Sequence, residues 1–162
     1  MTSPTPGPDI ALDDLYRDIL LDHYRSPRNR GRLEGRATNA ADGANPLCGD
    51  ELTVEVTVED GTITEIAIDG RGCSISQASA SMMSVFVRER GTAEALEAVE
   101  TFQRMMLKGE TPPEEFGDIE ALAGVMKFPV RVKCASLGWK TLEQALGDGG
   151  SVSTDERSTG DD

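Results

Sequence analysis

Alternation of apolar and polar residues is the clearest pattern in the sequence. From Glu51 to Glu59, Leu or Val occupies every second position, and Glu or Thr fills the positions between them. A strict period of two is typical of a β-strand with one buried face, because successive side chains of a strand point to opposite sides. Asp60 and Gly61 then turn the chain into a second strand, Thr62 to Asp69. The pattern predicts an antiparallel hairpin.

The length of the hairpin loop decides which side chains face each other. A two-residue loop places Val56 opposite Glu65 and would bury a carboxylate. A three-residue loop, with Gly61 in the left-handed conformation, places Val54 opposite Ile66. We predict the three-residue loop, because it keeps the apolar faces of both strands on the same side of the sheet.

Apolar residues with helical spacing precede and follow the hairpin. Recurrence at every third or fourth position predicts helices, which Pro and Gly residues terminate. The predicted helices cover residues 11–24, about 74–90, a stretch after Thr92, 118–127 and about 135–146. A hairpin followed by a block of helices is typical of an α+β fold, here a small antiparallel β-sheet with helices packed on it.

The two ends of the chain differ in composition from the middle. Residues 1–10 are rich in Pro and Thr, and residues 147–162 contain a single apolar side chain, Val152. Segments of this kind bury too little apolar surface to offset the entropy lost on folding. We therefore expect a disordered N-terminal lead at 1–10, one domain at 11–146 and a disordered acidic tail at 147–162.

Composition and charge narrow the class of protein. No apolar run approaches the roughly 20 residues that span a bilayer, and the N-terminus lacks the basic start and apolar stretch of a secretory signal. We expect a cytoplasmic protein without a membrane partner. The net charge of −13 and the pI of about 4.5 disfavour binding to nucleic acid, since phosphate backbones are repelled by such a surface.

Arginine residues crowd one segment despite the negative net charge. A cluster of this kind is either a solvated face or a docking patch for a partner, and the sequence leaves both interpretations open. The residues concerned are Arg25, Arg28, Arg30, Arg32 and Arg36.

Three cysteines are the candidate functional residues. Without a secretion signal, a reducing compartment is expected, and a structural disulfide is disfavoured there. The thiols are then buried and inert, or metal ligands, or reactive. Their local sequences have to decide between these alternatives.

Two of the cysteines flank the predicted hairpin. Cys48 and Asp50 come directly before the first strand, and Gly49 between them lets the backbone turn sharply enough for both side chains to reach one ion. Cys73 follows the second strand. Because the strands are antiparallel neighbours, the start of one lies beside the end of the other. We expect Cys48, Asp50 and Cys73 to meet at the same end of the hairpin.

The third cysteine opens the last predicted helix. Cys134 follows Arg131 and Lys133, and both the helix N-terminus and these cations favour a thiolate. If Cys134 reaches the hairpin end, three thiolates and one carboxylate form a donor set that suits tetrahedral Zn²⁺. No CxxC pair is present, so the spacing by itself leaves a metal site and inert buried thiols both open.

Several longer motifs resemble SufU-type proteins within the wider group of IscU-like and NifU-like iron–sulfur cluster assembly proteins. The resemblance runs from about residue 12 to residue 146. The motifs are LDHYRSPRNRG at 21–31, NPLCGD at 45–50, GRGCSISQASASMM at 70–83, GDIEAL at 117–122 and KFPVRVKCA at 127–135.

Two features place the resemblance in the zinc-dependent sulfurtransferase branch. Scaffold members resembling IscU carry a histidine directly before the final cysteine, where this chain has Lys133. The stretch between Cys73 and Cys134 is also long, as in members resembling SufU. The resemblance implies zinc ligation by Cys48, Asp50, Cys73 and Cys134.

The resemblance also implies a function and partners. Cys134 would accept persulfide sulfur from a SufS-like cysteine desulfurase and pass it to a SufBCD-like scaffold complex. Whether the chain then counts as an enzyme is left open, since it would act as co-substrate and activator of the desulfurase. One alternative is a scaffold that assembles a transient [2Fe–2S] cluster, or holds iron, on the same residues. Another is a zinc-stabilised interaction module without transfer chemistry.

Two further residues have competing interpretations. His23 is the only histidine and lies four positions after Ile19 on the apolar face of the first helix, so we predict a packed or hydrogen-bonded side chain rather than a metal ligand. Arg131 pairs with Asp50, contacts the desulfurase or is solvated. The first two are favoured because Arg131 lies three residues before Cys134.

Overall fold

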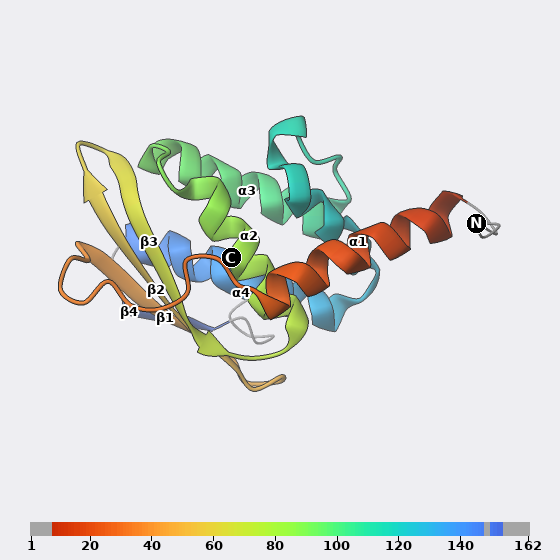
Figure 1. The fold of residues 1–162 in the computed structure, drawn as a ribbon, viewed down its shortest axis with the longest axis horizontal. Helices are drawn as coiled ribbons and strands as arrows, with labels where there is room; N and C mark the ends of the chain where they lie inside the picture. The colour runs from red at the N-terminus through yellow and green to blue at the C-terminus, as the bar shows by residue number, and fades with distance from the viewer. Residues whose placement is uncertain (1–7, 148–149, 154–162) are drawn as a thin grey trace.

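The computed structural model describes residues 8–147 and 150–153. Within these residues, four strands and five helical segments follow one another (Figure 1). They are α1 (Pro8–Arg25), β1 (Asn39–Asn45), β2 (Asp50–Glu59), β3 (Thr62–Arg71), α2 (Ser74–Val87), α3 (Thr92–Lys108), the 3-10 segment η1 (Glu114–Lys127), α4 (Pro129–Leu146) and β4 (Gly150–Ser153).

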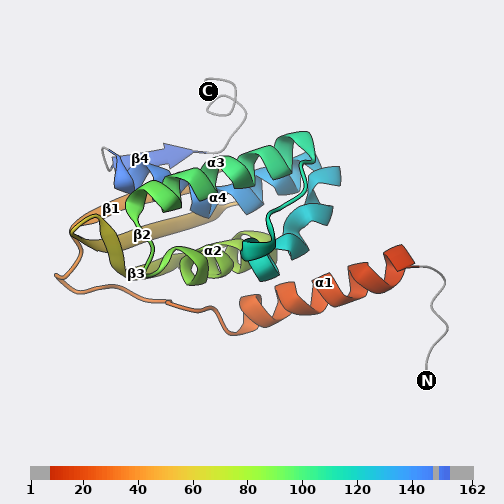
Figure 2. The same cartoon turned by 90° about the horizontal axis from the view of Figure 1, so that it is seen from above.

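A single small sheet with helices against it confirms the predicted α+β class. The strand order is β3-β2-β1-β4, in which the first three are antiparallel and β4 is parallel to β1. Helices α2 and α4 pack against each other and against the sheet, while α1 packs on α2 and η1 (Figures 1 and 2). None of the helices in the described part of the chain is long and apolar enough to cross a membrane.

The predicted hairpin forms, but the predicted loop is wrong. Glu59 pairs with Thr62, so the loop has two residues, Asp60 and Gly61, both with positive φ. Two positive φ angles are the signature of a type I′ turn, which matches the twist of the strands. The pairing of Val56 with Glu65 that we expected from this loop is avoided by a bulge between Thr57 and Val58, which pairs Glu65 with Thr57 instead.

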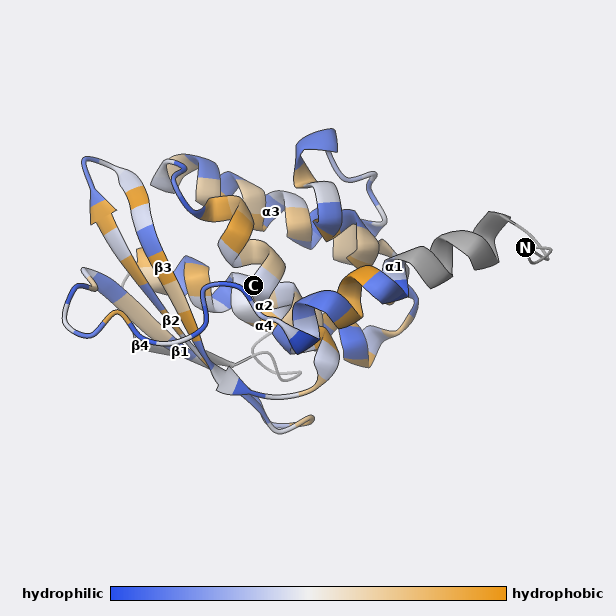
Figure 3. Ribbon diagram, in the orientation of Figure 1, coloured by the Kyte–Doolittle hydropathy of each residue, from blue (hydrophilic) through white to orange (hydrophobic). Residues whose placement is uncertain are grey.

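Because of the bulge, apolar residues of β2 and β3 face each other, but in different pairs from the predicted ones. Val54 faces Ile68 and Val56 faces Ile66, rather than Val54 facing Ile66. Buried and more exposed positions alternate along β2 as far as Val56, and the pattern changes at Thr57, which is buried. Figure 3 shows the alternation of apolar and polar residues along β2 and β3.

Small residues let α4 approach its neighbours closely. A Cβ on Gly43 of β1 would collide with Thr141 of α4, and one on Gly138 would crowd Ala80 of α2. Next to Gly138 on α4, the Trp139 ring stacks on Phe102 of α3, with centroids 4.4 Å apart and an interplanar angle of 7°. Both rings are fully buried. The core therefore fixes α4, which carries Cys134, against the sheet and α2.

Several predicted boundaries differ from the structure. Helix α1 begins at Pro8, so residues 8–10 of the predicted lead are helical, and residues 150–153 of the predicted acidic tail form β4. Residues 1–7, 148–149 and 154–162 of these segments lie outside the described residues. Helix α2 ends at Val87 rather than near 90, and η1 begins at Glu114 rather than 118.

Candidate metal centre

Three segments that are distant in the sequence meet at the open end of the β2–β3 hairpin. Cys48 lies in the loop between β1 and β2, and Asp50 is the first residue of β2. Cys73 follows β3 at the N-cap of α2, and Cys134 lies on the buried side of α4. The predicted convergence at this end rests on the pairing of Glu51 with Arg71, which puts the start of β2 beside the end of β3.

Three of the four candidate ligands form a compact group. The ligand atoms of Cys48, Asp50 and Cys134 all lie within 4.8 Å of one another. The Cys48 and Cys134 sulfurs are 3.2 Å apart, and all three cysteines are free thiols. Cys73 is not part of this group, but its sulfur lies 3.9 Å from Asp50 Oδ2. The site thus joins three thiols around one carboxylate.

Asp50 is buried, with an exposed fraction of 1%. Its Oδ1 accepts a hydrogen bond of 2.9 Å from the backbone N–H of Cys73, and within the described residues it forms no ion pair. A Cβ on Gly72 would collide with this carboxylate and with Ser76, so only glycine fits beside it. Burying a carboxylate without a cationic partner costs folding free energy. A bound metal ion would compensate this negative charge.

The donor set fits zinc. Two sulfurs on one tetrahedral Zn²⁺ lie roughly 3.8 Å apart when each Zn–S bond is about 2.3 Å. The Cys48 and Cys134 sulfurs are 3.2 Å apart, about 0.6 Å less than this separation, so the two sulfurs would have to move apart by that amount to bind one Zn²⁺. Thiolate-rich donor sets select Zn²⁺, Cu⁺ or iron–sulfur clusters over the hard cations Mg²⁺ and Ca²⁺.

The prediction that Cys134 opens a helix is wrong, and Cys73 does so instead. Helix α4 begins at Pro129, so Cys134 lies in its second turn. Proline is favoured at the first position of a helix, because the N–H that it lacks has no intrahelical partner there. Cys73 occupies the N-cap position of α2, at the positive end of the helix dipole, although its side chain makes no capping hydrogen bond.

The pKa values of the two cysteines differ in the same sense, with Cys73 rather than Cys134 favoured as the thiolate. The Cys134 thiol and the Ser76 backbone lower the pKa of Cys73 to about 5, although burial opposes the shift. The contact with Cys73, followed by burial and the contact with Cys48, raises the pKa of Cys134. Without a metal ion, the fold itself therefore favours a thiolate at Cys73 and a protonated thiol at Cys134, opposite to the prediction.

Comparison with known proteins places the chain in a family. The model of the NifU-like N terminal domain matches residues 15–135, which contain all four candidate ligands. The chain belongs to the NifU-like N-terminal domain family. The resemblance predicted from the motifs is confirmed.

Three relatives show how widely the similarity to this NifU-like domain extends. The zinc-dependent sulfurtransferase SufU of Bacillus subtilis is 42% identical over 136 residues, 83% of this chain and 91% of that protein. The iron–sulfur cluster assembly scaffold protein IscU of Streptococcus pyogenes is 40% identical, over 83% of this chain and 84% of that protein. The crystal structure of a SUF-system scaffold protein from Fervidobacterium islandicum has a TM-score of 0.74 at 35% identity, over 80% of this chain and 94% of that one.

The two cations beside Cys134 lie in the first turns of α4 in this NifU-like domain. Arg131 is exposed and Lys133 is half-buried, and neither forms an ion pair within the described residues. Arg131 therefore does not pair with Asp50. It lines a surface hollow together with Lys127 and Phe128. Contact with a partner and solvation remain as its two interpretations.

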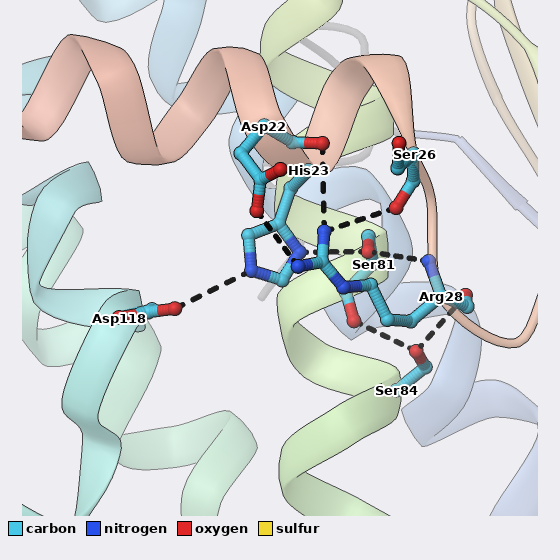
Figure 4. A network of polar contacts seen from close by, with 7 residues as sticks. All are labelled: Asp22, His23, Ser26, Arg28, Ser81, Ser84 and Asp118. Carbon is cyan, nitrogen blue, oxygen red and sulfur yellow. Dashed lines mark hydrogen bonds and ion pairs between the residues drawn. The ribbon is translucent and has the colours of Figure 1, made fainter.

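His23 is a buried, hydrogen-bonded side chain, as predicted. Its Nδ1 lies 2.8 Å from Ser81 Oγ on α2, and its Nε2 lies 3.5 Å from Asp118 Oδ2 on η1 (Figure 4). Its exposed fraction is 4%. Burial, reinforced by Arg28, lowers the pKa of His23 against the opposing effect of Asp118. His23 thus fastens α1 to the body of the domain, away from the metal centre.

The arginine-rich segment is mostly held by internal contacts. Arg28 pairs with Asp22, Arg32 with Glu55 and Asp69, and Arg36 with Glu65, while Arg30 donates to the carbonyl of Gly70. The contacts of Arg30, Arg32 and Arg36 attach the loop after α1 to strands β2 and β3. These internal contacts argue against a docking patch made of free arginines in this segment.

Two residues at the site were not predicted from the sequence. Ser76 lies one turn after Cys73, and its Oγ is 3.9 Å from the Cys73 sulfur. Asn45 is fully buried, and its Nδ2 is 3.7 Å from the Cys134 sulfur. Asn45 opens the NPLCGD motif, so its place next to Cys48 was the available signal, although nothing in the spacing pointed to Cys134.

Proposed function

We propose that this NifU-like domain binds one Zn²⁺ through Cys48, Asp50, Cys73 and Cys134 and accepts sulfur on Cys134. One observation carries the proposal. A buried carboxylate and three convergent thiols lie together without a cationic partner for Asp50 among the described residues. A divalent ion turns this costly arrangement into a favourable one.

Zinc would keep the cysteine ligands of this site deprotonated. When bound, Zn²⁺ displaces the thiol protons and holds its cysteine ligands as thiolates, which includes Cys134, whose pKa the fold raises. Because Cys134 has an exposed fraction of 0%, its thiolate would be held in a buried position, shielded from solvent.

The transfer step itself needs only thiol chemistry. The Cys134 thiolate attacks the terminal sulfur of a persulfide on the donor enzyme and forms a new S–S bond. The donor's S–S bond breaks, and its electron pair leaves with the donor cysteine as a thiolate. The terminal sulfur moves to Cys134 together with its proton. Atoms and charge balance without an oxidant or reductant.

Access to Cys134 is the structural requirement of this step. Cys48 is the most exposed of the three cysteines and lies in a four-residue loop that contains Gly49, with φ of +73°. Its sulfur is 3.2 Å from that of Cys134. We propose that displacement of this loop opens the way to Cys134 and leaves the packed helices in place.

The donor and acceptor follow from the similarity to SufU. We propose a SufS-like cysteine desulfurase as the donor and a SufBCD-like scaffold complex as the acceptor, in the cytoplasm. The relative of 42% identity is named a zinc-dependent sulfurtransferase, which supports this assignment. The chemistry needs reduced thiols and hence a reducing compartment.

Assembly of a [2Fe–2S] cluster on the same residues is the second candidate. It is favoured by the name of the Streptococcus pyogenes relative, a scaffold protein at 40% identity. Lys133 argues against it, because scaffold members resembling IscU carry histidine at this position. The two candidates differ in the metal that the protein retains.

Elemental analysis of aerobically purified protein separates the two candidates. We expect close to one equivalent of zinc per chain, little iron and no visible absorption, because Zn²⁺ has a filled d shell. Stoichiometric iron with visible sulfur-to-iron absorption would favour the scaffold instead. Zinc below about a tenth of an equivalent would contradict the proposed site.

A further inference from the structure

Asn45 lies at the junction of the elements that build the metal centre. It is the last residue of β1 and pairs with Asp50, the first residue of β2. Its backbone carbonyl accepts hydrogen bonds from the N–H groups of Cys48 at 3.1 Å and Gly49 at 2.9 Å. The main chain of Asn45 thus shapes the loop that carries Cys48, and any side chain at this position would serve that purpose.

The side chain of Asn45 has a different environment. It is completely buried, with an exposed fraction of 0%. Its Nδ2 donates to the sulfur of Cys134 at 3.7 Å, and its Oδ1 has no hydrogen-bond partner within the described residues. The amide therefore makes one hydrogen bond, and that bond goes to the sulfur proposed to carry the transferred atom.

For the stability of the fold, this amide is a poor choice. A buried carbonyl oxygen without a partner costs free energy, whereas an apolar side chain of the same shape would cost none. Leucine has nearly the shape of asparagine and would fill the same space. The amide contributes little to the fold that leucine would not, and its one specific contact is with Cys134.

We propose that Asn45 is a positioning residue, which holds the Cys134 sulfur through its N–H···S hydrogen bond. The inference rests on the proposed function, in which Cys134 must leave the metal and meet an incoming persulfide. A hydrogen bond from a charge-neutral donor to a thiolate is charge-assisted and directional. It keeps the released sulfur oriented toward the Cys48 loop, through which the partner reaches it.

Asn45→Leu tests the inference, with Asn39→Leu as a matched control. Asn39 lies at the other end of β1, where its Nδ2 donates to the Ala145 carbonyl at 3.0 Å and its Oδ1 accepts from Thr38 at 2.7 Å. The control removes an amide of the same strand that bonds to α4 but not to sulfur. Three quantities are measured: the melting temperature, the absorption of the cobalt-substituted protein, and the rate of persulfide formation on Cys134 with a cysteine desulfurase and cysteine.

The expected results separate a positioning role from a structural one. Asn45→Leu should melt no lower than wild type, shift the sulfur-to-cobalt charge-transfer band to longer wavelength, and slow persulfide formation about tenfold at saturating desulfurase. The half-saturating desulfurase concentration should not change, because Asn45 is buried and touches no partner. Asn39→Leu should show the reverse, a lower melting temperature with an unchanged band and rate.

Two outcomes would overturn the inference. One is an Asn45→Leu protein with the wild-type band and the wild-type rate. The other is a lower melting temperature together with effects on band and rate that Asn39→Leu reproduces, which would make Asn45 a structural residue. If wild-type Cys134 acquires no sulfur, the proposed function fails instead, and the cobalt band alone still decides whether Asn45 acts on the sulfur.

Discussion

At the scale of single residues, Asp50 is the group whose environment is hardest to explain without a metal ion. It is 1% exposed, with one backbone N–H as its close hydrogen-bond donor. Cys73 and Cys134 sit on either side of it with oppositely shifted pKa values. A bound cation would stabilise the Asp50 carboxylate and the Cys73 thiolate and would favour the thiolate form of Cys134, so the free energy of metal binding also becomes folding free energy.

Replacing this carboxylate should change stability in opposite directions with and without metal. Asp50→Asn keeps an acceptor for the Cys73 N–H and removes the charge. We expect the metal-free protein to gain about 1 kcal/mol in the free energy of unfolding and zinc affinity to fall by at least about tenfold. Denaturation with and without a chelator, and competition with a zinc indicator, measure the two effects. The exposed Asp42, changed to Asn, is the control, and equal effects of both variants would sink this explanation.

At the scale of elements, the attachment of α1 depends on a titratable side chain. His23 links α1 to Ser81 of α2 and Asp118 of η1, while Asp22 and Arg28 lie beside it (Figure 4). Burial lowers its pKa below the ordinary 6.5, so the unfolded chain takes up a proton at a higher pH than the folded one. Stability is therefore complete above about pH 6.5 and decreases as the pH falls through the folded-state pKa.

Stability measured against pH checks the role of His23. Between about pH 7.5 and 5.5, the free energy of unfolding of wild type should decrease more than that of His23→Gln, which cannot titrate. Asp118→Asn should steepen the decrease, because Asp118 opposes the lowering of the His23 pKa. Parallel curves for wild type and His23→Gln would show that the ring is not the titrating group.

The elements also show what the sequence was able to predict. Period-two and helical patterns found β2, β3 and the helices, because each has a clear apolar face. Strand β1 was missed, since Asn39–Asn45 contains no β-branched or aromatic residue and is stabilised by pairing with β2 and packing under α4. The bulge at Thr57 was missed because it depends on the pairing of β2 with β3. The start of α4 at Pro129 was missed because proline can either end one helix or occupy the first turn of the next.

The candidate site was predictable to a different degree. Chain order and strand pairing were sufficient to bring Cys48, Asp50 and Cys73 together. The helix argument for Cys134 failed, since the contact with Cys73, followed by burial and the contact with Cys48, raises its pKa against the effect that we expected from the helix N-terminus. Asn45 could not be assigned, because its contact with Cys134 spans 89 positions of the sequence.

At the scale of the whole molecule, the open end of the β2–β3 hairpin brings together residues from distant parts of the chain. The loop before β2, the turn after β3 and the first two turns of helix α4 meet there, and the match to the NifU-like family, over residues 15–135, includes all three segments. The protein carries a net charge of −13, yet Arg131 and Lys133 flank the site without ion pairs in the described chain. These two cations would complement an acidic surface on the proposed desulfurase.

Peptide mass spectrometry after incubation with a cysteine desulfurase and cysteine tests the central claim most directly. The account predicts one additional sulfur on the peptide that contains Cys134, and its loss in Cys134→Ala together with the acceleration of the desulfurase. Cys48→Ala and Cys73→Ala should lose activity only along with zinc and with a lower melting temperature. Added sulfur found mainly on Cys48 or Cys73, or wild-type sulfur transfer by Cys134→Ala, would contradict the account.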